Sequence, residues 1–191
     1  KFDKNTVDIT GIENAVYTGK PITLEPSKVK VFFKTGENTS RELKWGRDFK
    51  VSYSKNINKG TATVQFIGLE SSGFTGKVKK TFKITQVDIG DIAYVSRDKS
   101  MDDIQAVYSK AGVKPADQII LTNQAGKTLV EGVDYTLSYK NNKKVASKYE
   151  EKCPTIVVKG KGNYKGSFSV EFTILAGLLD SENISVKVNQ V

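Results

Sequence analysis

The sequence contains no histidine and a single cysteine, Cys153. Histidine is the usual general base at neutral pH and a common metal ligand, so its absence removes the main routes to catalysis. A lone cysteine cannot form an internal disulfide, and the fold must therefore be held together by packing. Cys153 precedes Pro154 at the start of an apolar run, which is typical of a small residue at a strand edge rather than of a reactive thiol.

Long hydrophobic runs are also missing. No stretch of about 18 apolar residues is present, so we expect no membrane-spanning helix in this segment. The last ten residues, ENISVKVNQV, have the pattern of a strand. We expect residues 176–191 to be a linker or the start of a further module, and the chain to be a piece of a longer protein.

Arginine is scarce, with three against 27 lysines. The arginine guanidinium group forms bidentate hydrogen bonds with phosphates and base edges. A composition so poor in arginine therefore argues against a nucleic-acid partner. The net charge of +9 is uneven, because residues 1–85 carry sixteen basic and eight acidic side chains. A lysine-rich solvated surface is the preferred interpretation, and a weak attraction to anionic cell-wall polymers is the alternative.

The main feature of the sequence is an internal repeat. The segment LKWGRDFKVSYSKN at 43–56 matches LVEGVDYTLSYKNN at 129–142 with a constant offset of 86 positions. Farther along, GFTGKVKKTFKI at 73–84 matches GNYKGSFSVEFTI at 162–174. A period of roughly 90 residues is too long for a solenoid unit and suits a small domain repeated in tandem. We predict two modules, residues 1–85 and 86–175.

Each copy contains a strand in which apolar and polar residues alternate, as expected when one face lies on a core and the other in water. The Leu-x-x-Gly-x-Asp segment before each strand predicts a turn, with Asp48 and Asp134 bonding to nearby backbone N–H groups. Turn signals recur at the spacing of short antiparallel strands, so we predict an all-β fold of two β-sandwiches. The predicted inward residues are Phe49, Val51 and Tyr53 in the first copy and Tyr135, Leu137 and Tyr139 in the second.

The two copies differ at their beginnings. In the second, Ser100 and Asp103 resemble a helix-capping box. Ile104, Val107, Tyr108 and Ala111 then follow at helical spacing, which predicts a short amphipathic helix over residues 101–111 packed on the second module. The connection at 85–92 is short and partly apolar, so we expect the two modules to form a fairly stiff rod.

Taken together, VYTGKPI, GRDFKVSYSKN, GVDYTLSYKNN, KGTATVQFIG and GKGNYKGSFSVEFTI resemble the immunoglobulin-like tandem repeats of large surface proteins of Gram-positive gut anaerobes. The resemblance covers most of residues 7–175, although the second copy lacks the YTGKP and GTATV segments. It implies an extracellular location at a bacterial cell surface. It also implies a non-catalytic spacer or scaffold whose partners are neighbouring domains of the same chain.

No set of residues predicts an enzyme, a cofactor or a metal site. The carboxylates Asp48 and Asp134 are equivalent turn residues, and Asp102 with Asp103 fits the start of the predicted helix. GKGNYKG lacks the Gly-Lys-Ser/Thr ending of a phosphate loop.

The alternative function is binding of a glycan or a cell-wall polymer. Trp45, the only tryptophan, aligns with Glu131, and Arg47 aligns with Val133, so the repeat does not require either residue. Trp45 could stack on a sugar ring while Lys44 and Arg47 provide hydrogen bonds or charge. An internal Lys–Asn crosslink is a third possibility, which would need a buried carboxylate beside the two partners.

Overall fold

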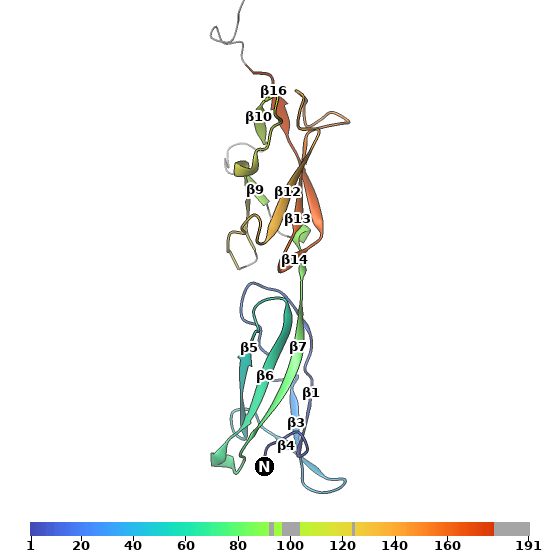
Figure 1. Ribbon diagram of the computed structural model, residues 1–191. Coiled ribbons are helices and arrows are strands. Elements are labelled where there is room, and N and C mark those ends of the chain that lie inside the picture. Colours follow the sequence, from blue (N-terminus) through green and yellow to red (C-terminus); the bar gives the residue numbers. More distant parts are fainter. Residues whose placement is uncertain (92–93, 97–103, 124, 178–191) are drawn as a thin grey trace, which may run out of the picture.

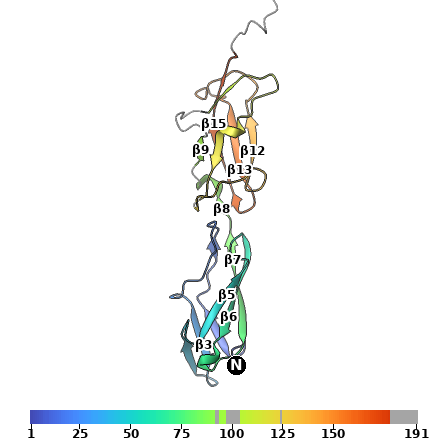
Figure 2. The same ribbon diagram turned by 90° about the vertical axis from the view of Figure 1, so that its left-hand side faces the viewer.

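The computed structural model describes residues 1–91, 94–96, 104–123 and 125–177. Within these residues the fold is mostly β, as predicted, and the helical segments are three short 3₁₀ turns: η1 (Glu70–Ser72), η2 (Ile89–Asp91) and η3 (Ala116–Gln118). Figure 1 shows an elongated molecule with residues 1–85, the N-terminal half, at one end and residues 86–177, the C-terminal half, at the other. The view turned by 90° in Figure 2 shows the same end-to-end arrangement.

The N-terminal half contains two sheets. One has the strand order β1-β3-β4 and is antiparallel, and the other has the order β2-β7-β6-β5, with β2 parallel to β7. Its strands are β1 (Val7–Thr10), β2 (Ala15–Val16), β3 (Lys30–Lys34), β4 (Ser40–Leu43), β5 (Phe49–Ser54), β6 (Gly60–Gly68) and β7 (Lys77–Thr85).

The C-terminal half has smaller sheets. The largest has the order β12-β13-β15 and is antiparallel, while β9 pairs with β11, β8 with β14, and β10 runs parallel to β16. Its strands are β8 (Val87–Asp88), β9 (Tyr94–Ser96), β10 (Gln105–Val107), β11 (Ile119–Leu121), β12 (Tyr135–Lys140), β13 (Thr155–Gly160), β14 (Tyr164–Lys165), β15 (Ser167–Glu171) and β16 (Thr173–Leu175).

Alternation along the strands places the core as the sequence predicts. In β6 the side chains of Ala62, Val64 and Phe66 are fully buried and their neighbours less so. In β5 and β12 the first inward residue of each strand is buried and the next two are half-buried. Buried side chains from both sheets of the N-terminal half belong to one hydrophobic core.

The Leu-x-x-Gly-x-Asp turn has the same geometry in both copies. The carboxylate of Asp48 accepts a hydrogen bond from the Lys44 N–H at 2.8 Å, and that of Asp134 accepts one from the Val130 N–H at 3.0 Å. The glycines of the two turns have φ angles of +84° and +82°, a left-handed conformation that glycine adopts at little cost. The predicted role of the two aspartates as turn residues is confirmed.

A second contact, a pair of hydrogen bonds made by an asparagine, is repeated in both copies. The Asn56 side-chain amide donates to the carbonyl oxygen of Ile22 at 2.8 Å, and the backbone carbonyl oxygen of Asn56 accepts from the Ile22 N–H at 2.8 Å. Asn142 forms the same pair of bonds with Val113, at 2.9 and 2.8 Å. This explains why an asparagine occurs at this position in both copies.

The helix predicted over residues 101–111 is wrong. Gln105–Val107 form strand β10, which pairs in parallel with Thr173–Leu175 of β16. Ile104 is buried, but Val107 and Tyr108 are 60% and 43% exposed, so the residues at helical spacing do not share a buried face. Ser100 and Asp103, the predicted cap, lie outside the described residues.

Strand β10 is the counterpart of β2. Ala15 pairs with Ile84, and Ala106 pairs with Ile174. Each alanine is the first residue of an AVY sequence. The Tyr17 N–H donates to the Thr85 carbonyl oxygen at 2.9 Å, and the Tyr108 N–H to that of Leu175 at 2.8 Å. The second copy therefore retains the opening strand, although it lacks the YTGKP sequence.

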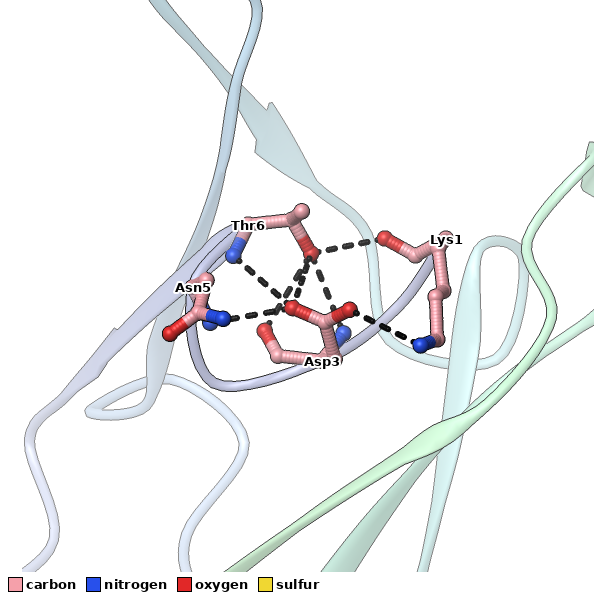
Figure 3. A network of polar contacts seen from close by, with 4 residues as sticks. All are labelled: Lys1, Asp3, Asn5 and Thr6. Carbon is pink, nitrogen blue, oxygen red and sulfur yellow. Dashed lines mark hydrogen bonds and ion pairs between the residues drawn. The ribbon is translucent and has the colours of Figure 1, made fainter.

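A polar turn lies directly before β1 (Figure 3). Asp3 Oδ1 accepts hydrogen bonds from the N–H groups of Asn5 at 3.0 Å and Thr6 at 3.2 Å. The Thr6 hydroxyl donates to the Lys1 carbonyl oxygen at 2.6 Å. The hydrogen bond from the Asn5 N–H is the largest cause of a lowered pKa for Asp3. Phe2 lies between Lys1 and Asp3 of this turn, and its side chain is fully buried.

Replacing either turn aspartate should destabilise the protein, because the change leaves a partly buried backbone N–H group without its acceptor. We expect Asp48→Ala and Asp134→Ala each to lower the free energy of unfolding by about 1–3 kcal/mol in urea titrations. Asp8→Ala is the control, since Asp8 is exposed and forms only a surface ion pair. Equal effects of all three changes would contradict the role of the turn.

Tyr139 is half-buried rather than fully buried, which reduces the effect expected from its truncation. It packs against the core in the inward register predicted for β12. We expect Tyr139→Ala to cost about 2 kcal/mol, below the 3–5 kcal/mol of fully buried aromatic residues. A melting temperature equal to that of the unaltered protein would show that the ring contributes no packing.

Candidate functional site

The predicted ligand residues Lys44, Trp45 and Arg47 all lie in the turn between β4 and β5. Trp45 is half-buried, and its ring packs on that of Phe49 with centroids 5.7 Å apart and planes at 45°. This contact continues the aromatic core, since Phe49 also packs on Phe66 at 5.8 Å. The structure thus places Trp45 as a cover over the end of β5.

The two basic neighbours of Trp45 are bound to carboxylates of the same region. The Lys44 ammonium group donates to Glu42 at 2.9 Å. The Arg47 guanidinium donates to both carboxylate oxygens of Asp48, at 2.8 and 3.2 Å. This contact is the largest cause of a lowered pKa for the buried Asp48 carboxyl. The three predicted residues therefore lie close together, but each has a partner within the protein.

A larger set of contacts lies where the two halves meet. Strand β7 continues through Gln86 into β8, which pairs in parallel with β14. The Gln86 side-chain amide donates to the carbonyl oxygens of Gly162 at 3.0 Å and Tyr164 at 2.8 Å. These bonds fix the connecting segment to the turn that precedes β14.

Asn163, in the same turn, binds the loop between β5 and β6. Its side-chain oxygen accepts a hydrogen bond from the Lys59 N–H at 2.8 Å, and its amide nitrogen donates to the Asn58 side chain at 3.0 Å. Its carbonyl oxygen also accepts from the Val87 N–H at 3.2 Å. One residue of the C-terminal half thus holds both the connecting segment and a loop of the N-terminal half.

The loop after β2 forms another part of the junction. The Tyr17 ring packs edge-on against that of Tyr164, with centroids 5.5 Å apart and planes at 87°. Gly19 lies so near the C-terminal half that a Cβ atom there would be 2.7 Å from the Asn123 amide nitrogen. With a φ of +79°, the position favours glycine on both steric and conformational grounds.

Two buried polar atoms at this junction have no hydrogen-bond partner within the described residues: the Tyr164 hydroxyl oxygen and Asn123 Nδ2. The two side chains are close enough for Asn123 to influence the Tyr164 hydroxyl, but their geometry does not complete a bond. Burial is the main cause that raises the pKa of Tyr164 to about 12, and the Asn123 side chain opposes this shift.

Sequence reasoning did not single out Tyr17, Tyr164, Gln86, Asn163 or Asn123 as contact residues. The available signal was a difference between copies, because Asn163-Tyr164 stands where the first copy has Gly73-Phe74. The contacts themselves join positions 76 to 105 residues apart, which a local pattern does not reveal.

In the described part of the chain, no group of three or more potential metal ligands gathers. The buried polar side chains there are Asp48, Asn123 and Asp134, and no lysine ammonium group bonds to them, so the geometry of a Lys–Asn crosslink is not formed in these residues. Cys153 is buried, with its sulfur 3.8 Å from the Thr155 hydroxyl.

Among the described residues, no helix is long and apolar enough to cross a membrane. A comparison of the chain with models of known protein families gives no match, and a comparison with curated proteins gives none either.

The raised pKa of Tyr164 predicts a loss of stability at alkaline pH. Between pH 10 and 12 the unfolded chain loses the tyrosine proton while the folded protein retains it, so stability falls as pH rises. Tyr164→Phe removes the unpaired hydroxyl, and we expect this variant to match or exceed the original stability at pH 7. Its free energy of unfolding should also decline less steeply from pH 10 to 11.5 in urea titrations. Parallel decline of both proteins would contradict this.

Trp45 should affect stability, because its ring covers Phe49. We expect Trp45→Ala to lower the free energy of unfolding by about 2 kcal/mol, as a half-buried aromatic residue should. Glu131 is exposed at the equivalent position, so Glu131→Ala should change it by less than about 0.5 kcal/mol. Chemical denaturation of the two variants measures both values. If Trp45→Ala leaves the free energy of unfolding unchanged, the ring has no structural role and Trp45 is again a candidate ligand residue.

Proposed function

We propose that this chain is a non-catalytic structural spacer made of two tandem immunoglobulin-like β-sandwich modules, and that it belongs to an exported bacterial cell-surface protein. The single observation that carries the proposal is the junction. Asn163 and the Tyr17–Tyr164 pair join the two halves, and the Gln86 bonds fix the connecting segment to the C-terminal half. A flexible linker needs none of these contacts, whereas a spacer of fixed length depends on them.

The repeated geometry supports the tandem arrangement. Equivalent turns, equivalent asparagine contacts and equivalent parallel strand pairs occur in both halves with offsets of 86 to 91 positions. Each half combines strands on which inward residues alternate with polar ones, which suits a sandwich. The cell-surface location rests on the resemblance of the sequence to surface-protein repeats.

The far end of the C-terminal half also supports a place in a longer series of modules. Val145, Leu175 and Val107 lie on adjacent segments there, and they are 52%, 43% and 60% exposed. Tyr108, the counterpart of Tyr17, is 43% exposed beside them. Because Tyr17 packs on a following half, we propose that this end contacts a neighbouring domain of the longer protein.

The polyanion alternative keeps one supporting observation. The N-terminal half carries a net charge of +8, and several of its lysines are exposed. Such a surface would attract anionic cell-wall polymers weakly, and raising the salt concentration would abolish the attraction. Retention on a teichoic-acid matrix at low salt that survives 0.5 M salt would contradict this purely electrostatic binding.

Residual dipolar couplings test the spacer directly. A stiff junction predicts that one alignment tensor fits the amide couplings of both halves. The double change Tyr17→Ala with Gln86→Ala removes junction contacts and should produce two tensors of different magnitude. Tyr108→Ala is the matched control, because the equivalent tyrosine at the far end is exposed and should leave the single tensor unchanged. Two different tensors in the unaltered protein would overturn the proposal.

A further inference from the structure

A groove of about 640 Å³ runs along β12 in the C-terminal half. It lies between β12 and the segment at 111–116. Leu137 and Tyr139, both half-buried, form its floor. The exposed side chains of Lys114, Glu131 and Lys143 lie along its rim.

The corresponding place in the N-terminal half has two contacts of its own. The Tyr53 hydroxyl, equivalent to that of Tyr139, accepts a hydrogen bond from the Leu24 N–H at 3.0 Å. Trp45, equivalent to Glu131, lies over Phe49 at the end of the strand. The tyrosine of the first copy is therefore engaged by its own module.

Neither contact is present in the C-terminal half. Pro115 occupies the position of Leu24, and proline has no N–H group to donate. Glu131 replaces the tryptophan and is exposed. The Tyr139 hydroxyl consequently has no hydrogen-bond partner in the described part of the chain, although its ring is half-buried on the core like that of Tyr53. Two differences between the copies therefore fall at the same place.

The chemistry of the groove defines the class of ligand. One aromatic face beside one aliphatic side chain suits the C–H face of a sugar ring. Lys114 and Lys143 form no ion pair within the described residues, so their donors are available, and the Glu131 carboxylate supplies acceptors. A fully apolar ligand would leave these charged groups without partners, and the carboxylate disfavours a nucleic-acid phosphate.

We propose that this groove binds an oligosaccharide, with a pyranose ring lying on Tyr139 and Leu137. The sugar hydroxyl groups hydrogen-bond to the Tyr139 hydroxyl and to Glu131, Lys114 and Lys143. The site is separate from Trp45 and lies in the half with little net charge. It gives the spacer a second activity, which is contact with a glycan along its length.

The test is titration of the full chain with maltohexaose, cellohexaose, xylohexaose and N-acetylchitohexaose, followed by amide chemical shifts. At least one sugar should shift the signals of Leu137 and Tyr139. The double change Pro115→Leu with Glu131→Trp copies the residues of the N-terminal half and should abolish binding. Tyr139→Phe keeps the ring and the fold, and should weaken binding about 3- to 10-fold through loss of one hydrogen bond.

Trp45→Ala is the matched control and should bind with unchanged affinity. The proposal is overturned if none of the four sugars shifts the groove signals, if the groove-closing variant still binds, or if Trp45→Ala alone removes binding. The dipolar couplings of the junction are independent of these results, so a failure here leaves the spacer proposal to be judged by its own measurement.

Discussion

The edge-on contact between Tyr17 and Tyr164 is the interaction on which the arrangement of the two halves depends. The Gln86–Gly162 and Asn163–Lys59 hydrogen bonds around it are exposed to water, so each contributes little by itself. The two tyrosine rings are buried, so their contact is a part of the junction from which water is excluded. The close approach at Gly19 is a consequence, because a larger residue would separate the same surfaces.

The two copies share a framework but differ in what they present to their surroundings. Asp48 and Asp134, like Asn56 and Asn142, satisfy backbone groups at equivalent positions of the two copies. The differing positions are those that meet another surface or solvent. Tyr17 is buried, whereas Tyr108 is 43% exposed. Trp45 packs on Phe49, whereas Glu131 at the equivalent position is exposed. Divergence between the copies therefore marks the places where function is to be sought.

The β framework could be predicted from the sequence because period-two alternation and turn residues act over a few positions. Phe49 and Tyr135 are buried at the starts of their strands for this reason. Strand β10 was missed because four apolar residues happen to fall at helical spacing, whereas pairing with β16 outweighs that local pattern. The matching AVY at 15–17 and 106–108 was the signal that would have corrected it.

The candidate sites could not be derived in the same way. The junction joins segments far apart in the chain, and only the fold brings Asn163 to Lys59. Comparison of the copies did single out position 45, but the groove lies at its counterpart, where Glu131 and Tyr139 both line it. Trp45 thus has a structural role in the first copy, where it packs on Phe49. Its replacement by Glu131 in the second copy contributes to the proposed groove.

The central claim is that the two halves keep one fixed arrangement, and a distance measurement between them tests it most directly. Ser52 and Ser138 are exposed and occupy equivalent positions on β5 and β12. Spin labels attached to cysteines at these two positions, with Cys153 replaced by alanine, report the distance between the halves by pulsed electron resonance. The account predicts one narrow distance distribution that broadens when Tyr17 is replaced by alanine. A broad or multiple distribution with Tyr17 in place would contradict it.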